Sequence, residues 1–329
     1  MINSHRRVLI QANDVSVRFE THQGFLRDLF SKQKRTVSAL DGIDLSIYDG
    51  EIFSLVGESG SGKTTLGKTL LQLVKPTEGS VTFAGEEIRR QDLRAFRKKA
   101  QMIFQDPYQS LNPKDLIFDI VAEPLRVHDM AGSEANLQER VVQALEWAGL
   151  KPGEQFLYRY PHELSGGQRQ RVVIAAALIL NPSFIVADEP VSMLDVSVRA
   201  DILKLMVKLR DERSISYLFI THDLSLAWLI SDRVAIMYLG KIVEIGSAEL
   251  IAGGGLHPYT QALVSVMPTP EKRMNRKRTI LKGETPDPGN APGGCRFHPR
   301  CPVATDRCRT ESPRLVEVEP EHYVSCHLV

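Results

Sequence analysis

Short apolar runs alternate with amphipathic stretches along most of the chain, and their lengths fit strands followed by helices. Residues 8–19 end in alternating apolar and polar positions, which predicts a strand with one exposed face. The later runs are more uniformly apolar, as in strands buried on both faces. We predict strands at 51–56, 184–187 and 217–220, and helices at 63–73, 168–180 and 198–210. Strands that alternate with helices indicate an α/β fold with a parallel sheet covered on both faces.

Three segments interrupt this alternation. Residues 20–36 are polar and basic and are predicted to form an inserted loop. Residues 106–163 contain three X-Pro steps before a helical stretch at 137–150, which indicates a helical subdomain. The chain beyond residue 252 holds ten of the 18 prolines, so it is predicted to be rich in loops. We therefore expect an α/β core in two parts, a helical subdomain and a C-terminal extension, with boundaries at 1–105, 106–165, 166–252 and 253–329.

Composition narrows the class of protein only a little. The 329 residues carry 41 basic and 40 acidic side chains, a net charge of +1 that gives no reason to expect a nucleic-acid partner. The most apolar stretch, residues 172–180, is far shorter than the roughly 20 residues that a membrane-spanning helix needs. No signal-peptide core follows the first residues, so we expect a cytoplasmic protein.

Residues 57–64 read GESGSGKT and match the pattern G-x-x-x-x-G-K-[ST]. Glycine-rich turns allow backbone N–H groups to approach phosphates closely, and the helix that follows adds its positive N-terminal end. Lys63 is expected to reach the β- and γ-phosphates, and Thr64 to bind Mg²⁺. The alternative is a glycine turn with a surface lysine, which the flanking strand and helix disfavour. The predicted nucleotide-binding residues are Gly57, Glu58, Ser59, Gly60, Ser61, Gly62, Lys63, Thr64 and Thr65.

The predicted strand at 184–187 runs directly into two carboxylates, Asp188 and Glu189. Ligands of α/β proteins bind at the carboxyl ends of parallel strands, so Asp188 is placed to contact Mg²⁺. Glu189 suits a general base that positions the attacking water. The alternative, a strand capped by solvated acids, is weaker beside a phosphate loop.

Residues 164–168 decide the family. Leu164, Ser165, Gly166, Gly167 and Gln168 resemble the LSGGQ signature of ABC-type ATPases, a short glycine loop that opens a helix. The resemblance covers about residues 10–250 and implies a P-loop core with an inserted signature subdomain. It also implies that this loop closes over ATP held by a second ABC ATPase subunit, so that two nucleotides are sandwiched in a dimer.

Further positions resemble the family in the same order. Gln105 stands at the place of the Q-loop glutamine, which implies contact with Mg²⁺ and a catalytic role. Asp195 stands in a D-loop, although Met193 there replaces a usually smaller residue, and Ala176 stands where many relatives carry arginine. His222 resembles the switch histidine that contacts the γ-phosphate.

The aromatic residue that stacks on adenine is the least defined of these positions. Phe19 is the candidate, and the alternative is a core phenylalanine on a half-buried strand. Phe25 and Phe30 compete with it for the role.

The C-terminal extension resembles that of oligopeptide and dipeptide importer ATPases at residues 257–263, 294–297 and 300–302. This resemblance implies peptide import, and the importer family also carries nickel chelates, glutathione or oligosaccharides. The implied partners are a second ATPase subunit (a heterodimer, with a homodimer as the alternative), two transmembrane permease subunits and, through them, an extracytoplasmic substrate-binding protein. The implied location is the cytoplasmic face of the membrane. A soluble ABC ATPase that is not coupled to transport, or a purely regulatory module, is the competing hypothesis.

All four cysteines lie in this extension, at Cys295, Cys301, Cys308 and Cys326. Cysteines clustered in a reducing compartment point to metal rather than to disulfides. The resemblance implies a [4Fe–4S] cluster on these four residues. Zinc is the alternative metal, with His298, His322 or His327 as further ligands. Packing of the four as small apolar side chains also stays open.

Overall fold

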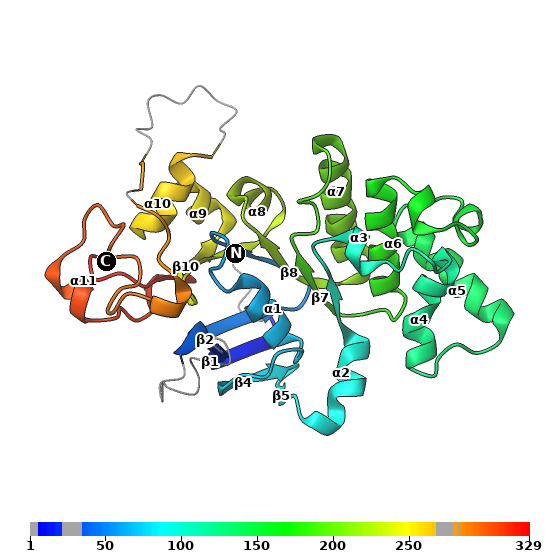
Figure 1. The fold of residues 1–329 in the computed structure, drawn as a ribbon, viewed down its shortest axis with the longest axis horizontal. Helices are drawn as coiled ribbons and strands as arrows, with labels where there is room; N and C mark the ends of the chain where they lie inside the picture. The colour runs from blue at the N-terminus through cyan, green and yellow to red at the C-terminus, as the bar shows by residue number, and fades with distance from the viewer. Residues whose placement is uncertain (1–5, 22–34, 268–278, 282) are drawn as a thin grey trace, which may run out of the picture. The chain divides into compact units, whose positions relative to one another are not determined.

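The computed structural model describes residues 6–21, 35–267, 279–281 and 283–329. These residues form two compact units (Figure 1). The first unit is built mainly from residues 88–220, and the second from residues 9–46, 53–87 and 221–329. Most of the predicted insert at 20–36 lies outside the described residues, and so do Phe25 and Phe30.

Three parallel strands form the sheet of the first unit. β7 (Phe184–Asp188) lies between β6 (Ala100–Ile103) and β8 (Ser216–Thr221), with Phe184 opposite both Ala100 and Ser216. Every residue of β7 and β8 is buried, as their apolar sequences require. α2 (Leu93–Lys99) leads into β6, and α7 (Val196–Arg213) connects β7 to β8. The parallel α/β arrangement predicted from the sequence is confirmed here.

A helical group is inserted between β6 and β7. It consists of α3 (Pro107–Ser110), α4 (Ile117–Val127), α5 (Glu134–Trp147) and α6 (Gly166–Leu178). α4 and α5 both pack against α6, and the three helices lie together in Figure 1. α5 begins where the Ser133 side chain accepts a hydrogen bond from the Asn136 amide, at 3.3 Å. The segment predicted as a helical subdomain is helical.

The second unit contains a four-stranded sheet in the order β2-β1-β4-β5. The strands are β1 (Val8–Thr21), β2 (Arg35–Tyr48), β4 (Glu78–Phe83) and β5 (Glu86–Glu87). Of these, only β1 was predicted. The β1–β4 and β4–β5 pairs are antiparallel, and β4 offers few buried positions of its own. β4 and β5 are short and largely exposed, so they give a weak period-2 signal, whereas β2 was missed although Ile43, Leu45 and Ile47 alternate with polar residues along it.

The second unit also holds a mixed sheet. β3 (Ile52–Val56) pairs in parallel with β9 (Arg233–Tyr238), and β10 (Lys241–Ser247) continues from β9 as an antiparallel partner. β12 (His322–Val324) pairs with β10, and β11 (Val316–Glu319) pairs with β12. The last strands of the chain therefore extend a sheet that begins at residue 52.

The helices of this unit are α1 (Lys63–Leu70), α8 (Leu224–Ile230), α9 (Ala248–Gly253), α10 (Pro258–Ser265) and α11 (Asp306–Thr310). Three aromatic side chains join the extension to the sheet: the ring of Tyr238 on β9 lies 4.8 Å from that of Tyr259 and 5.2 Å from that of Phe297. The extension is loop-rich as predicted, yet it shares one apolar core with β9 and β10. None of the helices in the described ranges is long and apolar enough to span a bilayer.

Candidate nucleotide site and cysteine segment

The phosphate loop leaves β3 and enters α1 in the second unit. Gly57 lies so close to the next strand that a Cβ atom there would stand 2.2 Å from the Met237 carbonyl oxygen. Gly62 caps α1 with a φ of 104°, and a Cβ at this position would meet the Ala39 carbonyl oxygen at 2.4 Å. Both positions therefore require glycine, and the loop leads directly into the N-terminal end of α1.

Lys63 folds back over this loop. Its ammonium group donates to the carbonyl oxygens of Gly57 at 2.8 Å and Glu58 at 2.9 Å, and its side chain is buried. These bonds place the positive charge at the mouth of the glycine turn, where a phosphate would be bound. Thr64 follows in the first turn of α1, so its hydroxyl belongs to the same turn. The loop geometry fits an anion, and hydroxyl oxygens are ligands that Mg²⁺ accepts.

The two acidic residues after β7 have different environments. Asp188 ends the strand and is buried, whereas Glu189 is half-buried with a φ of 46°. The Glu189 amide donates to the Ile220 carbonyl at 2.9 Å, which fixes this left-handed backbone. The Gln105 side-chain amide lies 3.1 Å from a Glu189 carboxylate oxygen. The structure thus brings together two of the three predicted catalytic residues.

The signature loop is the first turn of α6. The Ser165 hydroxyl accepts from the Gln168 amide at 3.3 Å, and the Gln168 side chain accepts from the Ser165 amide at 3.0 Å, a reciprocal capping box. A Cβ on Gly167 would stand 2.6 Å from Val198 on α7, so this glycine lets the two helices approach. Leu164 is buried, and the loop presents an exposed Ser165 at a 13-residue helix.

Sequence reasoning missed the residue that shapes the D-loop. Arg199 on α7 donates to the carbonyl oxygens of Leu194 at 2.7 Å and Ser192 at 3.4 Å. These bonds leave Asp195 exposed at the start of α7 and Met193 exposed beside it. An arginine in the first turn of an amphipathic helix carries no sequence signal for this role.

The remaining predicted residues lie at element ends. Phe19 is 43% exposed near the end of β1, so it is not the core phenylalanine that was its alternative. His222 is exposed directly after β8. Phe19, His222 and the phosphate loop belong to the second unit, while Gln105, Asp188, Glu189 and the signature belong to the first. The structure therefore defines two half-sites, each with its own geometry.

The four cysteines are free thiols in the second unit, and Cys308 is buried while the other three are half-buried. The Cys295 amide donates to the Cys308 carbonyl at 2.9 Å, which closes the segment into a loop around α11. Burial raises the pKa of the Cys295 thiol, and the other three thiols, acting electrostatically on it, raise this pKa further. Burial likewise raises the pKa of Cys301 and Cys326. Burial therefore disfavours the thiolate form of Cys295, Cys301 and Cys326.

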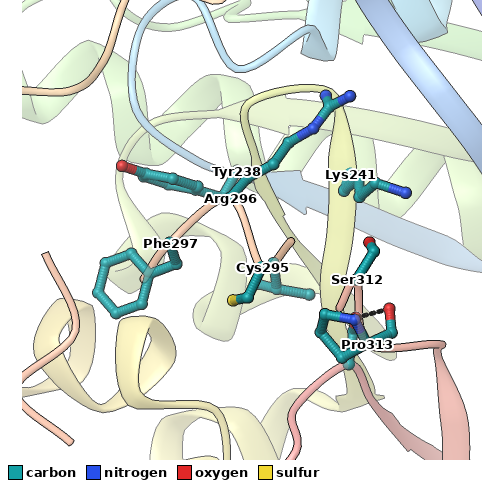
Figure 2. A pocket seen from close by; sticks show the side chains of 9 residues that line it. Tyr238, Lys241, Cys295, Arg296, Phe297, Ser312 and Pro313 are labelled. Atoms are coloured by element: carbon teal, nitrogen blue, oxygen red, sulfur yellow. Dashed lines mark hydrogen bonds between the residues drawn. The ribbon is translucent and has the colours of Figure 1, made fainter. Parts of the chain in front are cut away.

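In the part of the chain that the structure describes, no three His, Cys, Asp or Glu side chains are arranged to hold a single metal ion. A tetrahedral zinc ion needs thiolate sulfurs about 4 Å apart, given a Zn–S distance of about 2.3 Å. A small cavity of about 10 Å³ lies beside Cys295, lined by Arg296, Pro313 and neighbouring residues (Figure 2).

Comparisons with known proteins agree with the features of the two nucleotide half-sites. A family model described as "ABC transporter" matches residues 40–192, and one described as "Oligopeptide/dipeptide transporter, C-terminal region" matches residues 243–308. The oligopeptide transport ATP-binding protein AppF of Bacillus subtilis is 46% identical over 100% of this chain and 99% of its own. The oligopeptide transport ATP-binding protein OppF of Escherichia coli is 44% identical, over 99% of this chain and 97% of its own.

Solved structures give the same result for the fold. An ATP-binding cassette solved as a dimer in a post-hydrolysis state with ADP and Pi is 29% identical, with a TM-score of 0.63, over 73% of this chain and 99% of that one. CbiO1 of Clostridium perfringens, part of an ABC transporter complex, is 26% identical, with a TM-score of 0.64, over 75% and 91%. The phosphate loop, acidic strand end and capped signature helix define an ATPase of the ABC class. The chain belongs to the family of ABC transporter ATP-binding proteins.

Proposed function

We propose that this ATPase powers a membrane importer of di- or oligopeptides. The observation that carries the proposal is the match of residues 243–308 to the C-terminal region of oligopeptide/dipeptide transporters. The names of the similar proteins in Bacillus subtilis and Escherichia coli support the same cargo class. Nickel chelates, glutathione and oligosaccharides are the competing cargoes, and a soluble ABC ATPase is the competing role.

Copurification tests this proposal. The tagged full-length chain, expressed from its own locus, should bring down two permease subunits and a second ATPase subunit from detergent-solubilised membranes. The substrate-binding protein assigned to that permease should bind short peptides with micromolar or tighter affinity. Recovery of the chain without permease subunits would contradict a transport role. A binding protein that prefers nickel chelates, glutathione or oligosaccharides would contradict only the peptide cargo.

The proposed chemistry begins with nucleotide binding at the phosphate loop. Backbone N–H groups of residues 57–64 and the start of α1 hold the phosphates, and Lys63 exchanges its carbonyl partners for β- and γ-phosphate oxygens. Thr64, Gln105 and Asp188 supply a hydroxyl, an amide and a carboxylate oxygen, a donor set that suits Mg²⁺. When bound, Mg²⁺ neutralises phosphate charge that develops during transfer. Phe19, exposed at the end of β1, stacks on the adenine ring.

Glu189 is the proposed general base. A carboxylate accepts the proton of the attacking water, and Gln105 orients that carboxylate through its 3.1 Å hydrogen bond. His222 contacts the γ-phosphate from the end of β8 and reports its presence.

The signature loop is proposed to act on a partner's nucleotide. The Ser165 hydroxyl and the N-terminal end of α6 then face the γ-phosphate held by a second ATPase subunit, and Asp195 crosses the same interface. The similar cassette solved as a dimer with ADP and Pi supports this arrangement. A heterodimer is proposed, with a homodimer as the alternative. Docked on the permease, the pair sits at the cytoplasmic face of the membrane.

We also propose that Cys295, Cys301, Cys308 and Cys326 hold a [4Fe–4S] cluster, with Zn²⁺ as the alternative. The support is four half-buried or buried thiols in one loop-rich segment, in which Cys295 and Cys301 pack against the same apolar core and the Cys295 amide bonds to the Cys308 carbonyl. Such a cluster supplies iron–thiolate bonds that tie the segment together and a centre able to take up one electron. Anaerobically purified protein should absorb broadly near 400 nm and contain about four iron and four sulfide per chain. Colourless protein that contains zinc would contradict the cluster and support the alternative.

A further inference from the structure

Glu58 is an unexpected residue in a loop that binds anions. It is the second residue of the phosphate loop, and its backbone oxygen lies 2.9 Å from the Lys63 ammonium. A carboxylate one side chain away from the phosphate site would repel ATP unless another charge neutralised it. The role of Glu58 in nucleotide binding therefore depends on where its side chain goes.

The Glu58 carboxylate is bound by residues of the C-terminal extension. Its Oε2 atom lies 2.8 Å from Arg300 Nη1 and accepts a second hydrogen bond from the Thr285 hydroxyl. The side chains of Arg300 and Glu58 are only 10% and 29% exposed, so solvent screens this ion pair weakly. The Glu58 amide also donates to the Tyr259 hydroxyl at 3.2 Å. The extension therefore holds both the backbone and the side chain of this loop residue.

Arg300 is itself fixed in place. Its Nη1 atom also donates to the Thr285 hydroxyl at 3.1 Å and the Tyr238 hydroxyl at 3.4 Å, and its guanidinium lies 5.9 Å from the centre of the Tyr238 ring. Tyr238 belongs to the aromatic core shared with Tyr259. Its contacts with Arg300 therefore hold the arginine in place and restrict the movement of Glu58. The loop is held to a rigid surface.

A second arginine contacts residues that adjoin the phosphate loop. Arg296 pairs with Asp41 at 2.6 Å and donates to the Leu239 carbonyl. The next residue, Gly240, donates its amide to the Ser61 carbonyl at 2.7 Å. Arg296 follows Cys295 in the chain and Arg300 precedes Cys301, so one short segment supports the phosphate loop at two points.

We propose that Arg300 is a positioning residue for ATP binding: it neutralises the Glu58 carboxylate and fixes the phosphate loop in its binding conformation. The C-terminal extension thus sets the affinity of the ATP site through this ion pair. Removing the guanidinium leaves a partly buried carboxylate without its cationic partner beside the phosphate site and releases one anchor of the loop.

The test measures ATP affinity of the purified full-length chain by equilibrium binding, and KM and kcat of the assembled transporter. Arg300→Met should raise the ATP Kd and KM about tenfold while kcat at saturating ATP changes less than twofold, because Arg300 does not act on the reacting atoms. Arg300→Lys, which keeps the charge, should recover most of the affinity. Arg309→Met is the matched control, since Arg309 is exposed in the same extension and pairs only weakly with Asp306 at 3.9 Å.

A double variant separates charge neutralisation from simple attachment of the extension. Glu58→Gln combined with Arg300→Met should bind ATP at least threefold tighter than Arg300→Met alone, because the unpaired charge is gone. An attachment role predicts that the double variant binds no better than the single one, and that result would overturn the proposal. Unchanged ATP affinity in Arg300→Met would overturn it as well.

Thr285→Val provides the test if Arg300→Met does not fold. This change removes the hydroxyl that joins Glu58 to Arg300 and keeps the charge of both. We expect a two- to threefold rise in the ATP Kd, and no change in Kd would count against the proposal.

Discussion

The amide nitrogen of the Gln105 side chain lies 3.1 Å from a carboxylate oxygen of Glu189, although the two residues are 84 positions apart. Gln105 follows the end of β6, Glu189 follows the end of β7, and these strands are parallel neighbours. Their carboxyl ends therefore meet at one edge of the sheet. The contact connects the residue proposed to sense Mg²⁺ with the residue proposed to activate water.

Glu189→Gln should lower kcat about a hundredfold or more, because an amide cannot accept a proton from water. ATP binding should persist, so the variant should accumulate an ATP-bound dimer that size-exclusion chromatography detects. Glu212→Gln on α7 is the control, since Glu212 is exposed and makes only a 3.7 Å ion pair with Lys208. Unchanged turnover in Glu189→Gln would show that another group is the base.

Gln105→Ala should lower kcat about tenfold, which corresponds to about 1.4 kcal/mol and lies near the value of a hydrogen bond to a charged group. The loss should be smaller than in Glu189→Gln, because the base is still present but less well oriented. Steady-state ATPase assays with both variants give the ranking. A larger loss for Gln105→Ala than for Glu189→Gln would contradict the assigned roles.

Ser165→Ala should reduce the free energy of unfolding by about 1 kcal/mol, because it removes the N-cap of α6. Chemical denaturation followed by circular dichroism measures this change. Ser165→Thr keeps a hydroxyl cap and should restore most of the stability. The proposed contact with the partner's ATP makes a further prediction: Ser165→Ala should also lower ATPase activity of the dimer at temperatures where the fold is intact.

The pH dependence of stability should contain a contribution from His257. Burial lowers the pKa of His257 to about 4, from an ordinary value of 6.5, and its Nδ1 accepts the Tyr259 amide at the start of α10. As pH falls below 6.5, His257 becomes protonated in the unfolded chain but stays neutral in the folded chain. Stability is therefore complete above pH 6.5 and decreases toward pH 4, by up to about 3 kcal/mol at 1.36 kcal/mol per pH unit.

His257→Asn tests this contribution. Asparagine keeps a side-chain acceptor for the N-cap but does not titrate in this range. The free energy of unfolding, measured between pH 7 and pH 4.5, should fall less steeply in the variant. An equal slope in both proteins would show that His257 is not the group responsible.

The sequence predicts the strands and helices that flank the proposed nucleotide half-sites, because the signals for these elements are local. The phosphate loop lies between β3 and α1, the two acids lie at the end of β7, and the signature opens α6. Predicted strands and helices in this region agree with β3, β7, β8, α1, α6 and α7 within a few residues. Local periodicity and turn chemistry suffice for such elements.

Long-range contacts could not be predicted from the sequence. Glu58 and Arg300 are 242 positions apart. In the sequence, Arg300 has no feature that distinguishes it from an ordinary surface residue of a loop-rich segment. In the sheet formed by β1, β2, β4 and β5, only β1 was predicted; β4 and β5 are short, and β2 was missed although apolar and polar residues alternate along it. The two carboxyl-terminal strands, β11 and β12, are only four and three residues long, and they form where β12 pairs with β10 and β11 pairs with β12.

The central claim is that ATP hydrolysis by this chain is coupled to peptide import. The most direct measurement is the ATPase rate of the assembled transporter in proteoliposomes, with the binding protein either empty or loaded with a short peptide. We predict that the peptide-loaded binding protein stimulates hydrolysis severalfold and that Glu189→Gln abolishes the stimulated rate. Hydrolysis that is indifferent to peptide, or that proceeds equally without permease subunits, would contradict the claim.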